Sequence, residues 1–105
     1  EVLFYCPYCL FCLHCLDKTD GGAEARAKAR PAHLAWAANL GPCVRMAGPL
    51  LDESGNMLGS VFLIEADDLA AAKAIHAQDP YVTVGVFGHV HIHETRWAIG
   101  EGKPE

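Results

Sequence analysis

The sequence lacks an apolar run close to the roughly 20 residues that a membrane-spanning helix needs. It also lacks a dense basic segment, since eight Lys and Arg residues stand against thirteen Asp and Glu residues and give a formal net charge of −5. Proteins that bind the phosphate backbone of nucleic acids concentrate positive charge on one surface. The composition therefore argues against a membrane protein and against a nucleic-acid-binding protein. Internal repeats are absent as well.

The short length limits the chain to one domain. Its 105 residues, 51% of them hydrophobic and 20% charged, are typical of a globular domain that buries a core. The first four residues, Glu-Val-Leu-Phe, and Pro7 resemble the picornaviral 3C protease site used to remove purification tags, with Tyr5 and Cys6 in place of its Gln and Gly. We expect three segments: a tag remnant at 1–9, a domain at 10–99 and a flexible tail at 100–105.

Four of the five cysteines are spaced three apart near the N-terminus. Cys6 and Cys9 form a Cys-Pro-Tyr-Cys pattern similar to a glutaredoxin redox pair, and with Cys12 and Cys15 they resemble an iron–sulfur or zinc ladder. A redox pair of that kind opens a helix, whereas here an apolar, strand-like run follows. We therefore favour cysteines that belong to the core or to the tag, with a thiol or metal protein as the alternative. An odd number of cysteines, completed by Cys43, is typical of the reducing cytoplasm.

Apolar periodicity and turn residues predict four strands and two helices. The residues at 52–56, Asp-Glu-Ser-Gly-Asn, predict a turn that makes the flanking strands an antiparallel hairpin. The first helix contains Pro31, so we expect a looser or kinked entry before it. We expect strands at about 10–16, 44–51, 58–66 and 86–97, and helices at 23–40 and 67–78. The order β-α-β-β-α-β predicts an α+β, ferredoxin-like fold, an antiparallel sheet with both helices on one face.

One face of such a sheet has no helix to cover it. In the last strand we expect one face to carry Phe87 together with three histidines, and the other to carry Val90 and Ile92. The uncovered face is also one of the places open to Cys12 and His14. A second copy of the chain would bury that face, and we predict a homodimer. The alternate spacing of the histidines also occurs in metal sites, but we favour a polar dimer seam or a solvated edge for His89, His91 and His93.

Three motifs resemble a known family. They are Arg-Pro-Ala-His-Leu at 30–34, Ala-Gly-Pro-Leu at 47–50 and Asp-Pro-Tyr at 79–81, in that order along the chain. Over residues 10–98 the sequence resembles the YciI-like (YCII-related) family. The resemblance implies a dimeric ferredoxin-like fold related to muconolactone isomerase, with a His–Asp pair carried here by His33 and Asp79.

Part of the case for that pair rests on the residues alone. His33 lies early in one predicted helix and Asp79 at the end of the other, so helices packed on one sheet face would bring them close. An Asp that holds one imidazole nitrogen fixes the tautomer and leaves the other nitrogen to exchange a proton near neutral pH. Without the resemblance, a packed histidine and an aspartate that merely ends a helix explain the same residues.

Six further residues are candidates for substrate binding. Arg30 would hold an anionic or phenolate oxygen, with a solvated charge at the helix entry as the alternative. The resemblance implies that the strand break at Gly48 and Pro49 lines a pocket, and a plain bend of the sheet is the alternative. A buried histidine needs a hydrogen-bond partner, so His14 is expected either in the pocket or at the dimer face. Hydrogen bonds to substrate are expected from Ser60 and Tyr81.

The resemblance implies a small enzyme that uses no cofactor. We expect no metal in its site, and the odd number of cysteines favours the cytoplasm. Its His–Asp pair would perform acid–base chemistry on a small cyclic or phenolic substrate from aromatic degradation. The most concrete reaction is elimination of HCl from 5-chloro-2-hydroxyhydroquinone to give hydroxybenzoquinone, a dehydrochlorinase (lyase) reaction. The alternatives are a small-molecule-binding module that does not turn its ligand over and, ranked lower, the thiol or metal protein.

Overall fold

Strands and helices follow one another in the predicted order. The computed structural model describes residues 9–103, so nearly all of the tag remnant predicted at 1–9 and the last two residues of the predicted tail lie outside the described part. The elements are β1 (Leu10–Asp17), α1 (Gly22–Leu40), a 3-10 turn (Gly41–Cys43), β2 (Val44–Leu51), β3 (Met57–Glu65), α2 (Leu69–Ala77), the short α3 (Pro80–Thr83) and β4 (Phe87–Thr95).

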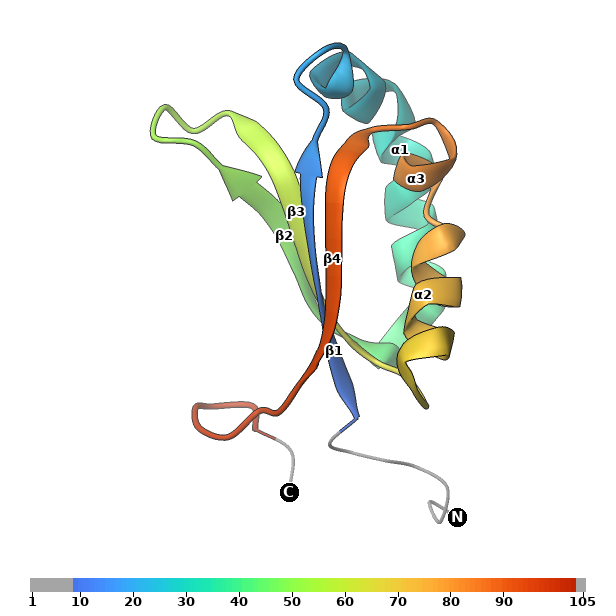
Figure 1. Cartoon of the computed structure of the whole chain (residues 1–105), viewed down its shortest axis with the longest axis vertical. Coiled ribbons are helices and arrows are strands. Elements are labelled where there is room, and N and C mark those ends of the chain that lie inside the picture. The colour runs from blue at the N-terminus through green and yellow to red at the C-terminus, as the bar shows by residue number, and fades with distance from the viewer. Residues whose placement is uncertain (1–8, 104–105) are drawn as a thin grey trace.

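The strands form one antiparallel sheet in the order β2-β3-β1-β4. All the helices lie against the same face of that sheet (Figure 1). The predicted α+β, ferredoxin-like fold is therefore confirmed. Among the described residues 9–103, no helix combines the length and the hydrophobicity required to cross a bilayer.

Helix α1 is continuous from Gly22 to Leu40, so the looser entry expected before Pro31 is wrong. Pro31 and Ala27 are both exposed, and water can therefore reach the carbonyl that the proline leaves without a helical partner. The side of α1 that faces the sheet has few large apolar residues. Its buried residues repeat at spacings of four, three and four and include two that carry or can carry charge: Gly22, Arg26, Ala29 and His33.

A bulge at the start of β4 separates Phe87 from the histidines. Asp17 pairs with Phe87, but its neighbour Leu16 pairs with His89, so Gly88 is an extra residue in the ladder. Phe87 consequently faces the helices and packs in the core. The prediction that Phe87 shares a face with the histidines is therefore wrong, because strict alternation fails at a bulge.

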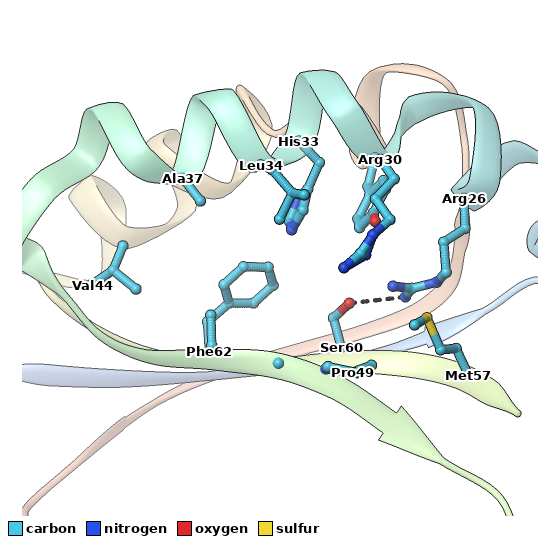
Figure 2. A pocket seen from close by; sticks show the side chains of 13 residues that line it. Arg26, Arg30, His33, Leu34, Ala37, Val44, Pro49, Met57, Ser60 and Phe62 are labelled. Atoms are coloured by element: carbon cyan, nitrogen blue, oxygen red, sulfur yellow. Dashed lines mark hydrogen bonds between the residues drawn. The ribbon is translucent and has the colours of Figure 1, made fainter. Parts of the chain in front are cut away.

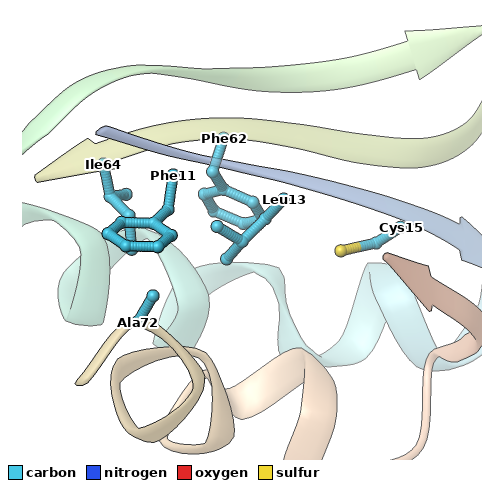
Figure 3. Close-up of a cluster of buried hydrophobic side chains, with 6 residues drawn as sticks. All are labelled: Phe11, Leu13, Cys15, Phe62, Ile64 and Ala72. Atoms are coloured by element: carbon cyan, nitrogen blue, oxygen red, sulfur yellow. The ribbon is translucent and has the colours of Figure 1, made fainter. Parts of the chain in front are cut away.

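The core lies between the sheet and the helices. It is built from alternate residues of β1 and β3 and one alanine of α2, as Figure 3 shows: Phe11, Leu13, Cys15, Phe62, Ile64 and Ala72. The remaining residues of these strands point to the opposite side of the sheet, where no helix lies. We call this side the open face, and its centre is formed by Cys12, His14, Val61, Leu63, His91 and His93.

The cysteines of the N-terminal ladder do not converge on one point. Cys6 lies outside the described residues, and Cys9 is disulfide-bonded. Cys12 points to the open face and Cys15 to the core, because side chains three apart in a strand face opposite ways. Burial raises the pKa of the Cys15 thiol to about 12, which keeps it protonated at neutral pH. Cys12 and Cys15 therefore cannot ligate one ion.

Candidate active site

A buried histidine–aspartate pair joins α1 to the start of α3. His33 Nδ1 lies 2.8 Å from Asp79 Oδ1. Asp79 precedes Pro80 at the N-cap of α3, and the same Oδ1 accepts a hydrogen bond of 2.9 Å from the backbone N–H of Tyr81. Asp79 is fully buried, and His33 retains 8% of its exposure. The structure thus brings the two residues together as a hydrogen-bonded pair shielded from solvent.

The pairing assigns the protons of the imidazole ring. An ionised carboxylate can only accept, so the proton lies on His33 Nδ1, and Nε2 of the neutral ring is left as a proton acceptor. The ring is also fixed by its neighbours. Tyr81 stacks on it with 3.8 Å between ring centroids and 9° between planes, and the rings of Trp36 and Phe62 lie 5.8 and 5.9 Å away. His33 is therefore oriented both by a hydrogen bond and by packing.

A second buried network lies about two helical turns before His33. Arg26 forms two 2.8 Å bonds to the carboxylate of Asp17, from Nε to Oδ2 and from Nη2 to Oδ1, and Nη2 also donates to Ser60 Oγ at 2.8 Å. Its guanidinium lies over the ring of Tyr81, 4.7 Å from the centroid. Burial opposes the charge of Arg26, but the bonded carboxylate outweighs it and holds the arginine pKa above its ordinary value.

This network was missed at the level of sequence. Arg26 lies in an alanine-rich helix, where an arginine is predicted to be exposed to solvent. Its spacing was the available signal, because residues 26 and 33 are two turns apart and so share one helix face with Ala29. A buried arginine needs a buried acceptor, and Asp17 at the end of β1 supplies it.

A cavity of about 360 Å³ lies between α1 and the β2–β3 hairpin (Figure 2). Its volume falls within the range of small-molecule sites, about 300–1,000 Å³. His33 projects into it from α1. Arginines and a hydroxyl line one end, Arg26, Arg30 and Ser60; apolar side chains line the other, among them Ala37, Val44 and Phe62.

Seven of the eight predicted site residues gather here. Six line the cavity: Arg30, His33, Gly48, Pro49, Ser60 and Tyr81. Asp79 lies behind His33. The exception is His14, which is exposed on the open face opposite His91, on the other side of the sheet. The structure does not bring His14 to the cavity, because β1 alternates and the neighbours Leu13 and Cys15 take the side that faces the helices.

The open face carries the remaining histidines. His91 and His93 have nearly parallel rings 6.4 Å apart between centroids. In the part of the chain from residue 9 to residue 103, no three His, Cys, Asp or Glu side chains converge closely enough to hold a metal ion. The chemistry that the described residues support at the cavity is proton transfer at His33.

Fold and site together define a small ferredoxin-like protein with a buried His–Asp pair beside a cavity at its helix–sheet interface. Residues 8–96 match the model of the YCII-related domain, and the chain belongs to that family. It is 38% identical over 84 residues to Protein YciI of Escherichia coli O6:H1, and equally to Protein YciI of Shigella flexneri. Each alignment covers 72% of this chain and 85% of the relative.

A solved structure shares the fold over nearly the whole chain. It is 5-chloro-2-hydroxyhydroquinone dehydrochlorinase (TftG) from Burkholderia phenoliruptrix AC1100, in complex with 2,5-dihydroxybenzoquinone. The TM-score is 0.75 at 24% identity, and the match covers 90% of this chain and 99% of that one. At this level of identity the likeness establishes a common fold.

Proposed function

We propose that this protein is a cofactor-independent acid–base enzyme that acts on a small cyclic or phenolic molecule. The observation that carries the proposal is the 2.8 Å contact between His33 and Asp79 at the wall of a cavity. Asp79 holds the proton on Nδ1, so that Nε2 takes a proton from the substrate and returns it at another position. The stacked ring of Tyr81 keeps the imidazole in place during the exchange.

The most concrete reaction is loss of HCl from 5-chloro-2-hydroxyhydroquinone, the compound for which the dehydrochlorinase of similar fold is named. His33 Nε2 takes the proton of the hydroxyl next to the chlorine and returns it to the ring carbon that bears chlorine, which gives a keto tautomer with chlorine on a saturated carbon. Nε2 then removes the proton of a second hydroxyl, the electron pair of that O–H bond forms a carbonyl through the ring, and chloride leaves with the C–Cl pair. The products are hydroxybenzoquinone and HCl, and no outside oxidant or reductant is needed.

The other residues that line the cavity would bind and orient the substrate. Arg30 holds a ring oxygen as it becomes anionic, and Ser60 donates a hydrogen bond to the same side of the ring. Tyr81 packs against the catalytic imidazole, and the backbone at Gly48 and Pro49 forms the wall opposite α1. His14 has no part in it because of its position on the open face.

Anaerobic release of chloride tests the reaction, since such phenols oxidise unaided in air. We expect release by the natural protein and a rate lower by about 10²–10⁴ in His33→Ala. His89→Ala is the matched control, because His89 is exposed on β4 and faces away from the cavity. Equal, slow release from all three proteins would refute this substrate and favour a binding module without turnover.

We propose in addition that the protein is a homodimer of the cytoplasm, joined through the open face. That face exposes apolar and imidazole side chains of three strands with no helix over them. Sedimentation velocity would show twice the chain mass. His14→Glu, placed at the centre of the face, is expected to shift the protein towards monomer, whereas Lys28→Glu on the far side of α1 is expected to leave its mass unchanged.

A further inference from the structure

We infer that the cavity accepts a small organic anion with an apolar substituent, bound with its oxyanion at Arg30 and Ser60 and its apolar end towards Val44. This inference rests on the proposed function and deepens it by naming the class of substrate. It follows from an asymmetry of the cavity, in which charge and hydroxyl lie at one end and hydrocarbon at the other (Figure 2).

The polar end has one uncompensated positive charge. Two arginines line it, but the charge of Arg26 is matched by the carboxylate of Asp17 through two 2.8 Å bonds. Arg30 is exposed and forms no hydrogen bond or ion pair with any residue that the structure describes. The other carboxylate of the site, Asp79, is bonded to His33 and does not line the cavity. An entering anion therefore meets Arg30 as its counter-ion.

Ser60 supplies a directed donor at the same end. Its Oγ already accepts a hydrogen bond from Arg26 Nη2, and the side chain is 4% exposed. A hydroxyl that accepts one bond still has its own hydrogen to give. No residue in the described range 9–103 accepts that hydrogen, and Ser60 lines the cavity. An oxyanion placed between Arg30 and Ser60 would receive a charge-assisted bond from each.

The opposite end of the cavity is apolar. Ala37, Val44 and Phe62 contribute no polar side-chain atom, and a polar group placed there would lose its hydrogen bonds to water without replacement. His33 lies between the two ends in Figure 2, so a ring held by its oxyanion would present its middle to Nε2. A substituent on the far side of the ring would then lie along Val44.

Binding of inert probes tests this class without any turnover. We would measure by calorimetry the dissociation constants of benzoate, 4-propylbenzoate and the uncharged 4-propylbenzamide. Full burial of a CH₂ group tightens binding roughly fourfold, and the propyl group has three carbons. We expect the whole group to tighten binding only about tenfold, because this end of the cavity is partly open. The amide is expected to bind about tenfold more weakly than its carboxylate, because it lacks the charge-assisted bonds.

Two variants separate the ends of the cavity. Arg30→Gln is expected to reduce the preference for the carboxylate over the amide to about twofold and to leave the propyl effect intact. Val44→Thr, of nearly the same shape, is expected to reduce the propyl effect and to leave the charge preference intact. Lys28→Gln, an exposed cation of the same helix outside the cavity, should change neither.

Equal binding of carboxylate and amide to the natural protein, or an unchanged preference in Arg30→Gln, would overturn the inference. So would weaker binding of 4-propylbenzoate than of benzoate. Because these probes do not react, failure of the chloride assay together with the expected binding pattern would reject the proposed reaction and keep the class of ligand. The reverse result, chloride release without the binding pattern, would reject the class alone.

Discussion

Replacing Asp79 by Asn would separate the proposed catalytic role of the buried pair from its structural role. Asp79 Oδ1 accepts two hydrogen bonds, from His33 Nδ1 and from the backbone N–H of Tyr81. Asn has nearly the same shape and keeps an oxygen for both, but it loses the negative charge. Its amide nitrogen also takes the place of Oδ2, a buried atom without a hydrogen-bond partner among the described residues.

The magnitudes of the two effects differ. Charge-assisted hydrogen bonds contribute about 1.5–3 kcal/mol and neutral ones about 1, so the change costs about 0.5–2 kcal/mol per bond. Removal of an uncompensated buried charge offsets part of that loss. We therefore expect the free energy of unfolding to fall by no more than about 2 kcal/mol. The rate is expected to fall about 10²–10⁴-fold, equivalent to about 3–5 kcal/mol, because the imidazole loses the group that fixes its tautomer and stabilises its protonated form.

Asp79→Ala provides the contrast. It leaves Tyr81 N–H and His33 Nδ1 buried without an acceptor, at about 1–3 kcal/mol each, so this variant should be the less stable of the two. Urea unfolding and anaerobic chloride release, measured on the same preparations, check both numbers. If Asp79→Asn kept its rate within about threefold of the natural protein while Asp79→Ala unfolded, Asp79 would be a helix cap and not part of the chemistry.

Three further outcomes are expected. Arg26→Met should lower the free energy of unfolding by about 3–5 kcal/mol in urea titrations, because it leaves the carboxylate of Asp17 nearly buried and unpaired. Gly59→Ala should unfold the protein or lower its melting temperature by more than 10 °C in calorimetry, about 2 kcal/mol or more, since a Cβ there would lie 2.2 Å from the carbonyl oxygen of Cys15. Burial lowers the pKa of His76 below its ordinary value of 6.5, so at acidic pH the unfolded chain binds a proton at this residue that the native chain does not. The free energy of unfolding from urea titrations should therefore fall as the pH is lowered from about 7.5 to about 5.5, and it should fall less in His76→Leu.

The order of elements was predictable because each boundary has its own local chemistry. The turn residues at 52–56 make the hairpin, Gly41 ends α1 with a positive φ of 64°, and Asp79 before Pro80 ends one helical segment and caps the next. The pairing of His33 with Asp79 was predicted from the family resemblance, and the helix boundaries alone supported it only in part, by placing both residues where one sheet face could bring them together. Boundaries of this kind depend on neighbouring residues in the sequence, so they can be predicted without knowing the tertiary structure.

The sequence-based predictions were wrong where one extra residue changed the register of a strand, and where a charged residue is buried although its type is usually exposed. Gly88 adds a residue to β4 and turns Phe87 to the helices, and nothing in the alternation of that strand reveals it. Of the two places predicted for His14, the uncovered sheet face is correct and the pocket is wrong. The apolar neighbours Leu13 and Cys15 could have decided between them, because they fix which face of β1 is buried. Arg26 could not be placed from composition, since its burial depends on Asp17, nine residues away on another element.

The buried face of α1 has few large apolar residues, and the proposed chemistry at the cavity explains this better than stability does. Gly22, Arg26, Ala29 and His33 occupy the positions that an ordinary amphipathic helix fills with leucine or valine. A buried ion pair such as Arg26 with Asp17 is often no more stabilising than hydrocarbon of the same volume. In a chain of 105 residues, where the core is small, such positions would favour apolar side chains if packing alone decided them. Two of the four, Arg26 and His33, are nevertheless polar, which supports the proposal that the interface between α1 and the sheet serves a ligand in the cavity.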